Sequence, residues 1–247
     1  MITDTEALVL RQIKTASNRR MIVLLTQRFG KVSAGTSISE RGRTKAALAI
    51  RPFCYGRYEL YKSRGSYNIN SAQTIQSFFG IGGDVDKYMY ASYALELADK
   101  LLPEEQPAPA MLNLLRDLLG MLDERKSAYG TLVAAFQVRA LQISGNAPVL
   151  SNCVRCGAKE NLTHFCIKDG GCVCENCARE ASHEGGVEPL DEEMLPAMQF
   201  MQQRPIRALE GIGLTPENES SMSRLLRSYI AYHLGVENLK SEEFLKQ

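Results

Sequence analysis

Four cysteines in two closely spaced pairs are the residues of this chain best suited to chemistry. Cys153 and Cys156 form the first pair, Cys174 and Cys177 form the second, and seventeen residues separate Cys156 from Cys174. Two C-x-x-C turns at this separation are typical of a tetrahedral metal site built from four thiolates. The sequence therefore predicts one Zn2+ site with these four cysteines as ligands.

This zinc site is predicted to be structural rather than catalytic. A catalytic zinc keeps an open coordination position beside a general base, whereas four thiolates close the coordination sphere. The chain has no H-x-E or H-E-x-x-H motif, because His183 is followed directly by Glu184. Two alternatives stay open within the ligand set: Cys172 could supply a sulfur, and His164 could replace one. The favoured roles are a small core residue for Cys166 and a spare thiol for Cys172.

No other motif of the chain indicates catalysis. The glycine-rich stretch Gly80–Gly83 lacks the third glycine of a dinucleotide-binding loop and the Gly-Lys-Ser/Thr end of a P-loop, so a linker is expected there. His233, close to the end of a predicted helix, is expected to be a surface or capping residue. No G-x-S-x-G nucleophile motif occurs. The chain is therefore predicted not to be an enzyme.

Basic residues are concentrated in the N-terminal third of the chain. Residues 1–80 contain 13 lysines and arginines against 4 aspartates and glutamates, a net charge of +9. Residues 81–247 carry a net charge of −8, so the total of +1 hides the asymmetry. A basic segment on an otherwise acidic chain is typical of a module that binds a polyanion.

The composition of this basic segment favours nucleic acid as the polyanion. Cations that follow phosphates and rings that stack on bases are what single-strand binding requires. Because alternate rings in a strand usually face the core, only one or two of the interleaved aromatic residues are expected on a binding face; these are Phe53, Tyr55, Tyr58, Tyr61 and Tyr67. The predicted contacts, with those of the long loop at 41, 43 and 45 preferred, are Arg11, Lys14, Arg19, Arg20, Arg41, Arg43, Lys45, Arg51, Arg57 and Arg64.

The same N-terminal segment has the hydrophobic pattern of short β strands. Residues 5–14 alternate, with Ala7 and Val9 on one face and Leu8 on the other. Segment 39–46 is polar, basic and glycine-containing, which predicts a loop. About five strands predict a small barrel of the OB or SH3 type. The expected strands lie at 5–14, 20–27, 31–37, 53–62 and 67–75, the last two around a hairpin turn at 63–66.

The remainder of the chain has a helical period interrupted by the cysteine pairs. Apolar residues recur every three or four positions over 84–145 and again after 190, which predicts a helical bundle. The expected helices are 85–102, 112–122, 132–143, 191–203 and 216–235. The fold class is therefore α+β and multidomain. The expected domains are a barrel at 1–80, a helical domain at 81–150 and 189–247, and a four-cysteine insert at 151–188.

Composition limits the classes of protein that this chain can belong to. Apolar residues make up 45% of the 247 residues, enough for a folded core. No apolar run of about 18 residues occurs and the N-terminus lacks a secretory pattern, so no membrane span and no leader are expected. Seven cysteines, six of them between 153 and 177, indicate metal ligands in a reducing cytoplasm rather than a disulfide framework.

Segments in the same order along the whole chain resemble the RecO family of bacterial recombination mediator proteins, in its zinc-finger-bearing branch. Thr5–Arg11 resembles the opening strand of the family, and the cysteine pairs match that branch. The other resembling segments are Leu24–Gly30 (LLTQRFG), Leu48–Phe53 (LAIRPF), Tyr90–Leu97 with Leu101–Glu105, Phe136–Pro148 and Leu239–Leu245.

The resemblance implies an N-terminal OB-fold, a helical domain and a zinc-finger insert. It also implies a function: binding of single- and double-stranded DNA, annealing of complementary strands, and help in loading RecA onto DNA coated by single-strand-binding protein. RecR and the acidic C-terminal tail of the single-strand-binding protein are the implied partners, and RecA is an indirect one. The implied location is the cytoplasm, in association with the nucleoid.

Two other functional classes remain open from the residues themselves. A zinc-dependent nucleic-acid enzyme would need an open metal position. A zinc-stapled interaction scaffold would use the basic face to bind an acidic protein segment.

Overall fold

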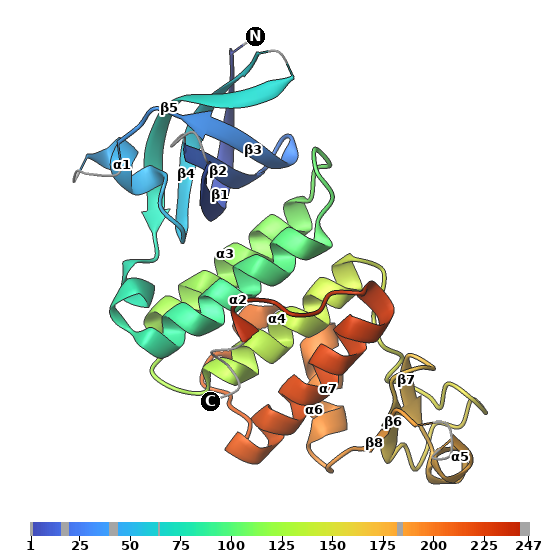
Figure 1. Cartoon of the computed structure of the whole chain (residues 1–247). Helices are drawn as coiled ribbons and strands as arrows, with labels where there is room; N and C mark the ends of the chain where they lie inside the picture. Colours follow the sequence, from blue (N-terminus) through green and yellow to red (C-terminus); the bar gives the residue numbers. More distant parts are fainter. Residues whose placement is uncertain (1, 16–19, 40–43, 64, 182–184, 243–247) are drawn as a thin grey trace. The chain divides into compact units, whose positions relative to one another are not determined.

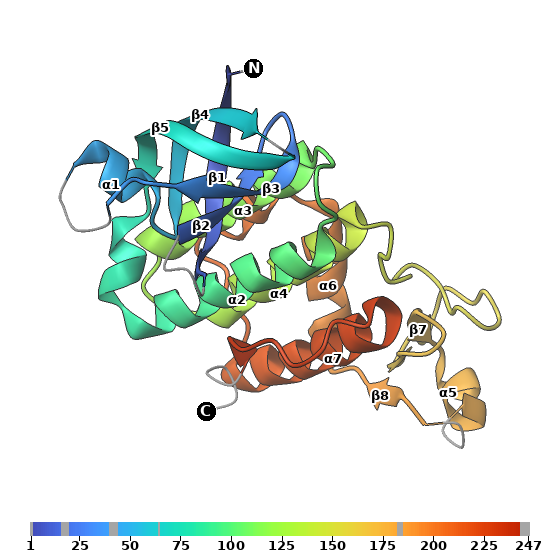
Figure 2. The ribbon, with the colours of Figure 1, turned by 45° about the horizontal axis from the view of Figure 1, so that its top comes forward.

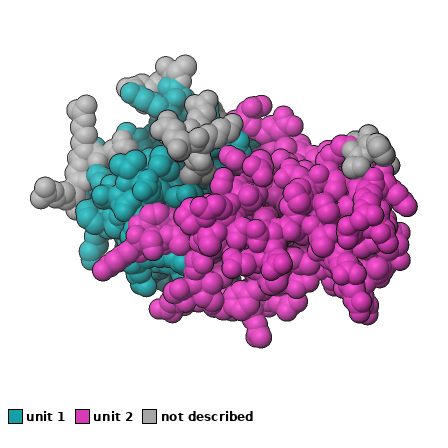
Figure 3. Space-filling model, turned by 90° about the horizontal axis from the view of Figure 1, so that it is seen from below, with its two compact units in different colours: residues 1–125, 239–247 teal, residues 126–238 magenta. Residues whose placement is uncertain are grey.

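The structure is a computed structural model of the chain, and it describes residues 2–15, 20–39, 44–63, 65–181 and 185–242. The chain forms two compact units, coloured separately in Figure 3. Unit 1 comprises Met1–Arg125 with Leu239–Gln247, and unit 2 comprises Lys126–Asn238. These units group the helices differently from the three domains expected from the sequence, whose boundaries stay a prediction.

Unit 1 contains a closed five-stranded barrel (Figure 1). The strand order is β1-β2-β3-β5-β4, with β3 and β5 parallel and every other pair antiparallel. A short helix lies between β3 and β4, and this topology is that of an OB-fold, which confirms the expected fold class. The strands are β1 (Ile2–Lys14), β2 (Arg20–Thr26), β3 (Gly30–Thr36), β4 (Cys54–Ser63) and β5 (Ser66–Ser77).

Strand β1 is buried on both of its faces. Ala7 and Val9 belong to the barrel core together with Ile22, Leu24 and other apolar residues of the strands. Leu8 is equally buried on the opposite face, where β1 packs against the helices of unit 1. Strand β1 therefore contributes side chains to two cores. The alternation in the sequence assigned Ala7 and Val9 to one face and Leu8 to the other, as the structure shows.

Two segments expected to be irregular contain helical residues. Of the predicted loop 39–46, residues 40–43 lie outside the described residues, and the last two residues belong to α1 (Lys45–Ala49), whose first turn is capped because the Thr44 side chain accepts a hydrogen bond from the Ala47 N–H. The predicted linker Gly80–Gly83 lies in the 3-10 helix η1 (Phe79–Gly83). Ile81 of η1 is fully buried, so burial of one apolar side chain orders this connection to the first long helix.

The long helices divide between the two units. In unit 1, α2 packs against α3; in unit 2, α4 packs against α6 and α7 (Figure 2). Capping explains several boundaries: Asp84 caps α2, Thr215 caps α7, and Gly235 ends α7 in a left-handed conformation. The helices are α2 (Val85–Leu101), α3 (Pro109–Glu124), α4 (Tyr129–Ile143), α6 (Met194–Gln203) and α7 (Pro216–Leu234), with a 3-10 turn η3 at Ile206–Leu209.

The cysteine-rich insert forms a small module of unit 2. Its three short strands, β6 (His164–Cys166), β7 (Gly171–Val173) and β8 (Val187–Pro189), make an antiparallel sheet in the order β7-β6-β8. The short helix α5 (Glu175–Ala181) completes the module. None of the described helices is both long enough and apolar enough to cross a membrane.

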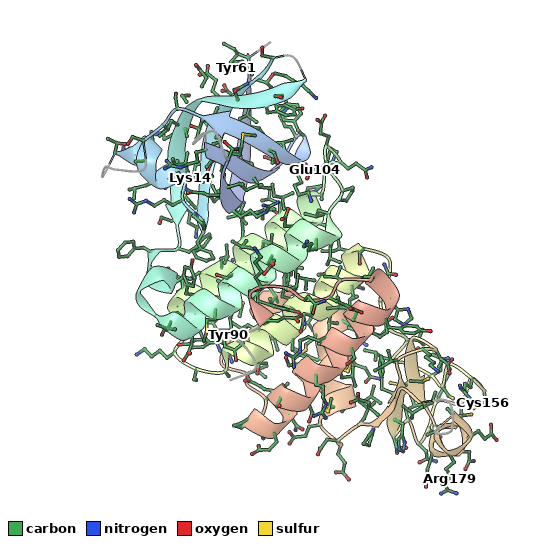
Figure 4. All side chains as sticks on the ribbon, viewed as in Figure 1. Lys14, Tyr61, Tyr90, Glu104, Cys156 and Arg179 are labelled. Carbon is green, nitrogen blue, oxygen red and sulfur yellow. The ribbon has the colours of Figure 1, made fainter. Side chains whose placement is uncertain are left out.

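A buried carboxylate joins the barrel to α2 within unit 1. Asp99 accepts from Arg11 Nε at 2.6 Å and lies 3.3 Å from Lys31 Nζ. Lys31, itself almost fully buried, also donates to the Asp99 carbonyl at 2.6 Å and pairs with Glu104, which lies beside β3 (Figure 4). Each buried charge thus has an opposite charge and a hydrogen bond, which such burial requires.

Removing this carboxylate should strongly destabilise the protein. Asp99→Asn leaves the buried Lys31 ammonium with only the exposed Glu104 carboxylate as a partner, so we expect the free energy of unfolding to fall by about 3 kcal/mol. Urea denaturation measures the change. Glu105→Gln, which breaks only the exposed pair with Lys62, is the control and should leave stability nearly unchanged. Equal effects of the two substitutions would contradict the role given to Asp99.

The turn into β3 accepts only glycine. Gly30 has a φ of +69°, and a Cβ there would lie 1.8 Å from the Gln106 carbonyl oxygen. We expect Gly30→Ala to lower the free energy of unfolding by at least about 2 kcal/mol, because backbone must move. Gly65→Ala is the matched control: it has a φ of +81° but open space around it, so only backbone strain of about 1 kcal/mol remains. Thermal or urea unfolding of both variants separates steric overlap from strain.

Candidate metal centre and barrel groove

The four predicted thiol ligands converge in the insert. The Sγ atoms of Cys153, Cys156, Cys174 and Cys177 all lie within 4.8 Å of one another. The Sγ atoms of Cys156 and Cys174 are 3.7 Å apart. A tetrahedral zinc with Zn–S bonds of about 2.3 Å places its sulfurs roughly 3.8 Å apart. The cluster therefore has the size and donor set of a four-thiolate metal site, and Figure 4 shows Cys156 on the insert.

Local backbone geometry positions each pair of sulfurs. After Cys153-x-x-Cys156, Gly157 has a φ of +78° and donates its N–H to the Cys153 carbonyl at 2.9 Å, closing a tight turn. Cys177 lies in the first turn of α5, and the Ala178 N–H donates to the Cys174 carbonyl at 2.9 Å. Two short local structures therefore hold the two pairs.

The pKa values of two clustered thiols, Cys153 and Cys177, are shifted in opposite directions. Such a difference is consistent with a site that binds a cation. Burial raises the pKa of the Cys153 thiol, but N–H groups of Cys156, Cys174 and Arg155 donate to its sulfur and lower the pKa to about 6. The neighbouring Cys174 thiol and burial raise the pKa of Cys177 well above its usual value. Four sulfurs this close cannot all ionise against one another, and a divalent metal removes that repulsion.

The other candidate ligands lie outside this cluster. Among the described residues the metal-spaced group contains neither His164, Cys166 nor Cys172. His164 Nδ1 instead lies 2.9 Å from the Thr163 hydroxyl. Cys166 and Cys172 are fully buried, and burial raises the pKa of both thiols, that of Cys172 to about 12. They are packing residues of the insert.

The hydrophobic core of the insert is small. Its cluster of buried residues consists of Cys153, Cys166, Val173, Cys174, Cys177 and Ala178, with Val154, Leu162 and Val187 packed against it. So small a core contributes little burial energy, and metal binding supplies the rest in such modules. The geometry favours a structural role.

His233 differs from the sequence expectation, because it holds the insert against α7 rather than capping the helix or facing solvent. Its Nε2 lies 2.7 Å from the Ile167 carbonyl oxygen, and its ring packs against Tyr229 at 4.3 Å. Tyr229 in turn contacts Phe165 of β6, with ring centroids 5.7 Å apart. The partner of His233 is 66 residues away in the chain, so local pattern could not reveal it.

The basic residues of the barrel fall into groups with different surroundings. Arg11 is bound by Asp99, and Arg57 pairs with Glu6 at 3.4 Å. Lys45 and Arg51 are exposed near α1. The remaining predicted contacts Arg19, Arg41, Arg43 and Arg64 lie outside the described residues.

Lys14 and Arg20 are directly opposite each other at the end of the β1–β2 ladder. Like charges in this arrangement destabilise a sheet unless an anion lies between or near them. Lys14 is exposed and Arg20 is half-buried, with Nη1 3.4 Å from the Ile38 carbonyl oxygen. Among the described residues, this pair places two cations side by side on the barrel.

Arg20 also lines a groove of about 740 Å3 on the barrel. The groove runs across the ends of β2, β3 and β5, the region that oligonucleotide-binding OB barrels use. Of the five aromatic residues considered, Tyr61 and Tyr67 line it, whereas Phe53, Tyr55 and Tyr58 are buried. Nothing in the sequence indicated that the neutral residues Met21, Gly35 and Asn68 would line this groove.

The residues that match known proteins extend over nearly the whole chain. Residues 1–78 match the family model described as Recombination protein O N terminal, and residues 82–243 match Recombination protein O C terminal. A protein of Alkaliphilus metalliredigens named DNA repair protein RecO is 27% identical over 248 residues, covering 100% of both chains. Proteins of the same name are 30% identical in Myxococcus xanthus, covering 99% of this chain and 97% of the relative, and 25% identical in Bacillus subtilis, covering 100% and 95%.

Loss of one clustered thiol should abolish metal binding and loosen the insert. We expect purified protein to contain about one equivalent of metal, and Cys156→Ser to contain little, with a lower unfolding temperature. Elemental analysis and thermal unfolding measure these effects. Cys54→Ser, which removes a thiol of the barrel, is the control and should keep the metal. Full metal content in Cys156→Ser would contradict the assignment.

Proposed function

The chain belongs to the RecO family of DNA repair proteins, and on this basis we propose that it is a DNA-binding recombination mediator. It binds single- and double-stranded DNA, anneals complementary strands and helps to load RecA onto DNA coated by single-strand-binding protein. RecR and the acidic tail of the single-strand-binding protein are its partners, in the cytoplasm at the nucleoid. The observation that carries DNA binding is the OB barrel with Lys14 opposite Arg20 beside a groove.

The charge distribution supports a sequence-independent contact with phosphates. The first 80 residues have a net charge of +9, yet Arg11 and Arg57 are partly neutralised by Asp99 and Glu6. Lys14 and Arg20 lie opposite each other on the barrel and are the phosphate contacts of this proposal, and Lys45 and Arg51 extend the positive surface toward α1. Phosphate contacts position the DNA without reading its sequence, as strand annealing requires.

The metal in this proposal is one structural Zn2+, held by the four clustered cysteines. It would bring together the turn at Cys153-x-x-Cys156 and the start of α5, and thereby order the insert. The protein is non-enzymatic, because a four-thiolate site leaves no coordination position for a substrate or a water nucleophile. The competing zinc-dependent enzyme requires such a position and gains no support from this donor set.

An interaction scaffold that binds an acidic protein segment is the second candidate function. The exposed cations of the barrel favour it, since an acidic segment and DNA would compete for the same charges. Competition between labelled DNA and oligoglutamate distinguishes shared from separate sites.

Removing the cross-strand cations should weaken DNA binding and its dependence on salt. Each phosphate contact contributes about one unit to the slope of log K against log salt. We expect Lys14→Ala and Arg20→Ala each to lower affinity several-fold for every sequence, and to make the slope shallower by about 1. Fluorescence anisotropy with short oligonucleotides over a series of salt concentrations measures both quantities.

Arg179→Ala is the matched control, because Arg179 is an exposed arginine of α5 outside the barrel (Figure 4). Its affinity and slope should equal those of the wild-type protein. An unchanged slope in the barrel variants, or a loss confined to one DNA sequence, would contradict the phosphate contacts. Absence of any DNA binding at low salt would reject the proposed function itself.

A further inference from the structure

The cysteines of this protein differ sharply in their access to solvent. Of the seven, all of which the structure describes, Cys156 alone is exposed. Its three neighbours in the thiol cluster are at most 8% exposed, and the thiols outside the cluster, Cys54, Cys166 and Cys172, are at most 2% exposed. A solute therefore meets the sulfur of Cys156 before that of any other cysteine, and Figure 4 shows this residue on the insert.

Metal binding keeps the exposed sulfur of Cys156 nucleophilic. A thiol that coordinates a divalent cation is deprotonated, and the thiolate is the form of cysteine that attacks an oxidant. Susceptibility to oxidation follows thiolate character together with exposure. Within the cluster only Cys156 combines the two, because its three partners are buried.

A second thiol lies within reach of Cys156. Cys174 Sγ is 3.7 Å from Cys156 Sγ, and a disulfide bond is about 2.05 Å long, so the two sulfurs need to approach each other by less than about 2 Å. The two residues are 18 positions apart in the chain and belong to different C-x-x-C pairs. A bond between them would take one sulfur from each pair.

We infer that Cys156 is a site of oxidation by hydrogen peroxide, and that its oxidation empties the metal centre. The Cys156 thiolate attacks one peroxide oxygen, and the O–O bond breaks to give a sulfenic acid and hydroxide. The Cys174 thiolate then attacks the Cys156 sulfur, so that an S–S bond forms, the S–O bond breaks and a second hydroxide leaves. Two electrons pass from the sulfurs to the peroxide, and two protons from solvent convert both hydroxides to water.

The disulfide removes two of the four thiolate donors. Only Cys153 and Cys177 remain as thiolates, whereas a structural zinc has four protein ligands. Metal affinity therefore falls, and because metal binding contributes folding energy in modules of this kind, the order of the insert becomes sensitive to peroxide. This inference goes beyond the proposed function and uses only its metal site.

The test treats the full-length, zinc-loaded protein with an excess of hydrogen peroxide. We expect one zinc ion to be released for each disulfide formed, as measured with a chromogenic zinc chelator, and mass spectrometry of peptides should find Cys156 joined to Cys174. Dithiothreitol followed by zinc should restore the metal content, because disulfide formation is reversible. Cys54→Ser, which removes a buried thiol of the barrel, is the control and should release zinc at the wild-type rate.

A histidine at position 156 separates oxidation from metal binding. Structural zinc sites also form from three cysteines and one histidine, so Cys156→His should still hold the ion. Without the exposed thiolate, peroxide should release zinc at least about ten-fold more slowly. Dimedone, which labels sulfenic acids, provides a second measurement on the wild-type protein: it should label Cys156 first. That measurement decides the entry point even if Cys156→His binds no zinc.

Several outcomes would overturn the inference. Dimedone labelling that begins at another cysteine would show that Cys156 is not the entry point. A disulfide that excludes Cys174, or zinc that stays bound after the disulfide has formed, would contradict the step that empties the site. A wild-type protein that binds no zinc would also overturn it. None of these measurements involves DNA, so each of these results leaves the proposed DNA binding intact.

Discussion

Closure of the barrel by β1 is the constraint on which the rest of unit 1 depends. The first half of β1 pairs with β4 and its second half pairs with β2, with Ala7 and Leu8 paired to both. A strand shared in this way must bend, and its register with β2 shifts between Val9 and Arg11. Because the sheet closes, β2, β3, β5 and β4 stay side by side, and residues of all four strands line one groove.

Charge in unit 1 is divided between structure and binding. Asp99 binds the almost fully buried Lys31 and the half-exposed Arg11, so part of the basic excess stabilises the fold, whereas the pair of Arg57 with Glu6 is exposed. Desolvated cations require such partners, whereas exposed cations do not. The net charge of the segment therefore includes at least one cation, Lys31, that is buried and bound within the unit.

Unit 2 contains the cysteine-rich insert, a module whose own hydrophobic core is small. The thiolate cluster joins the two halves of the insert, and contacts of Phe165 and Ile167 with Tyr229 and His233 attach it to α7. The thiol cluster and the packing on α7 are therefore complementary: the first lies within the module, and the second fixes the module within its unit.

The sequence by itself determined the features that depend on near neighbours in the chain: the barrel strands, the long helices and the four clustered thiols. Alternation, helical period and C-x-x-C spacing are local, so they survive without tertiary information. Only the tertiary structure decided that α1 forms, that His233 contacts the insert, and that Arg11 donates a hydrogen bond to Asp99, which is 88 residues away in the chain. The lining of the barrel groove is of the same kind, because strand register brings together Met21, Gly35, Asn68 and Tyr61, and nothing local to any one of them specifies the other three.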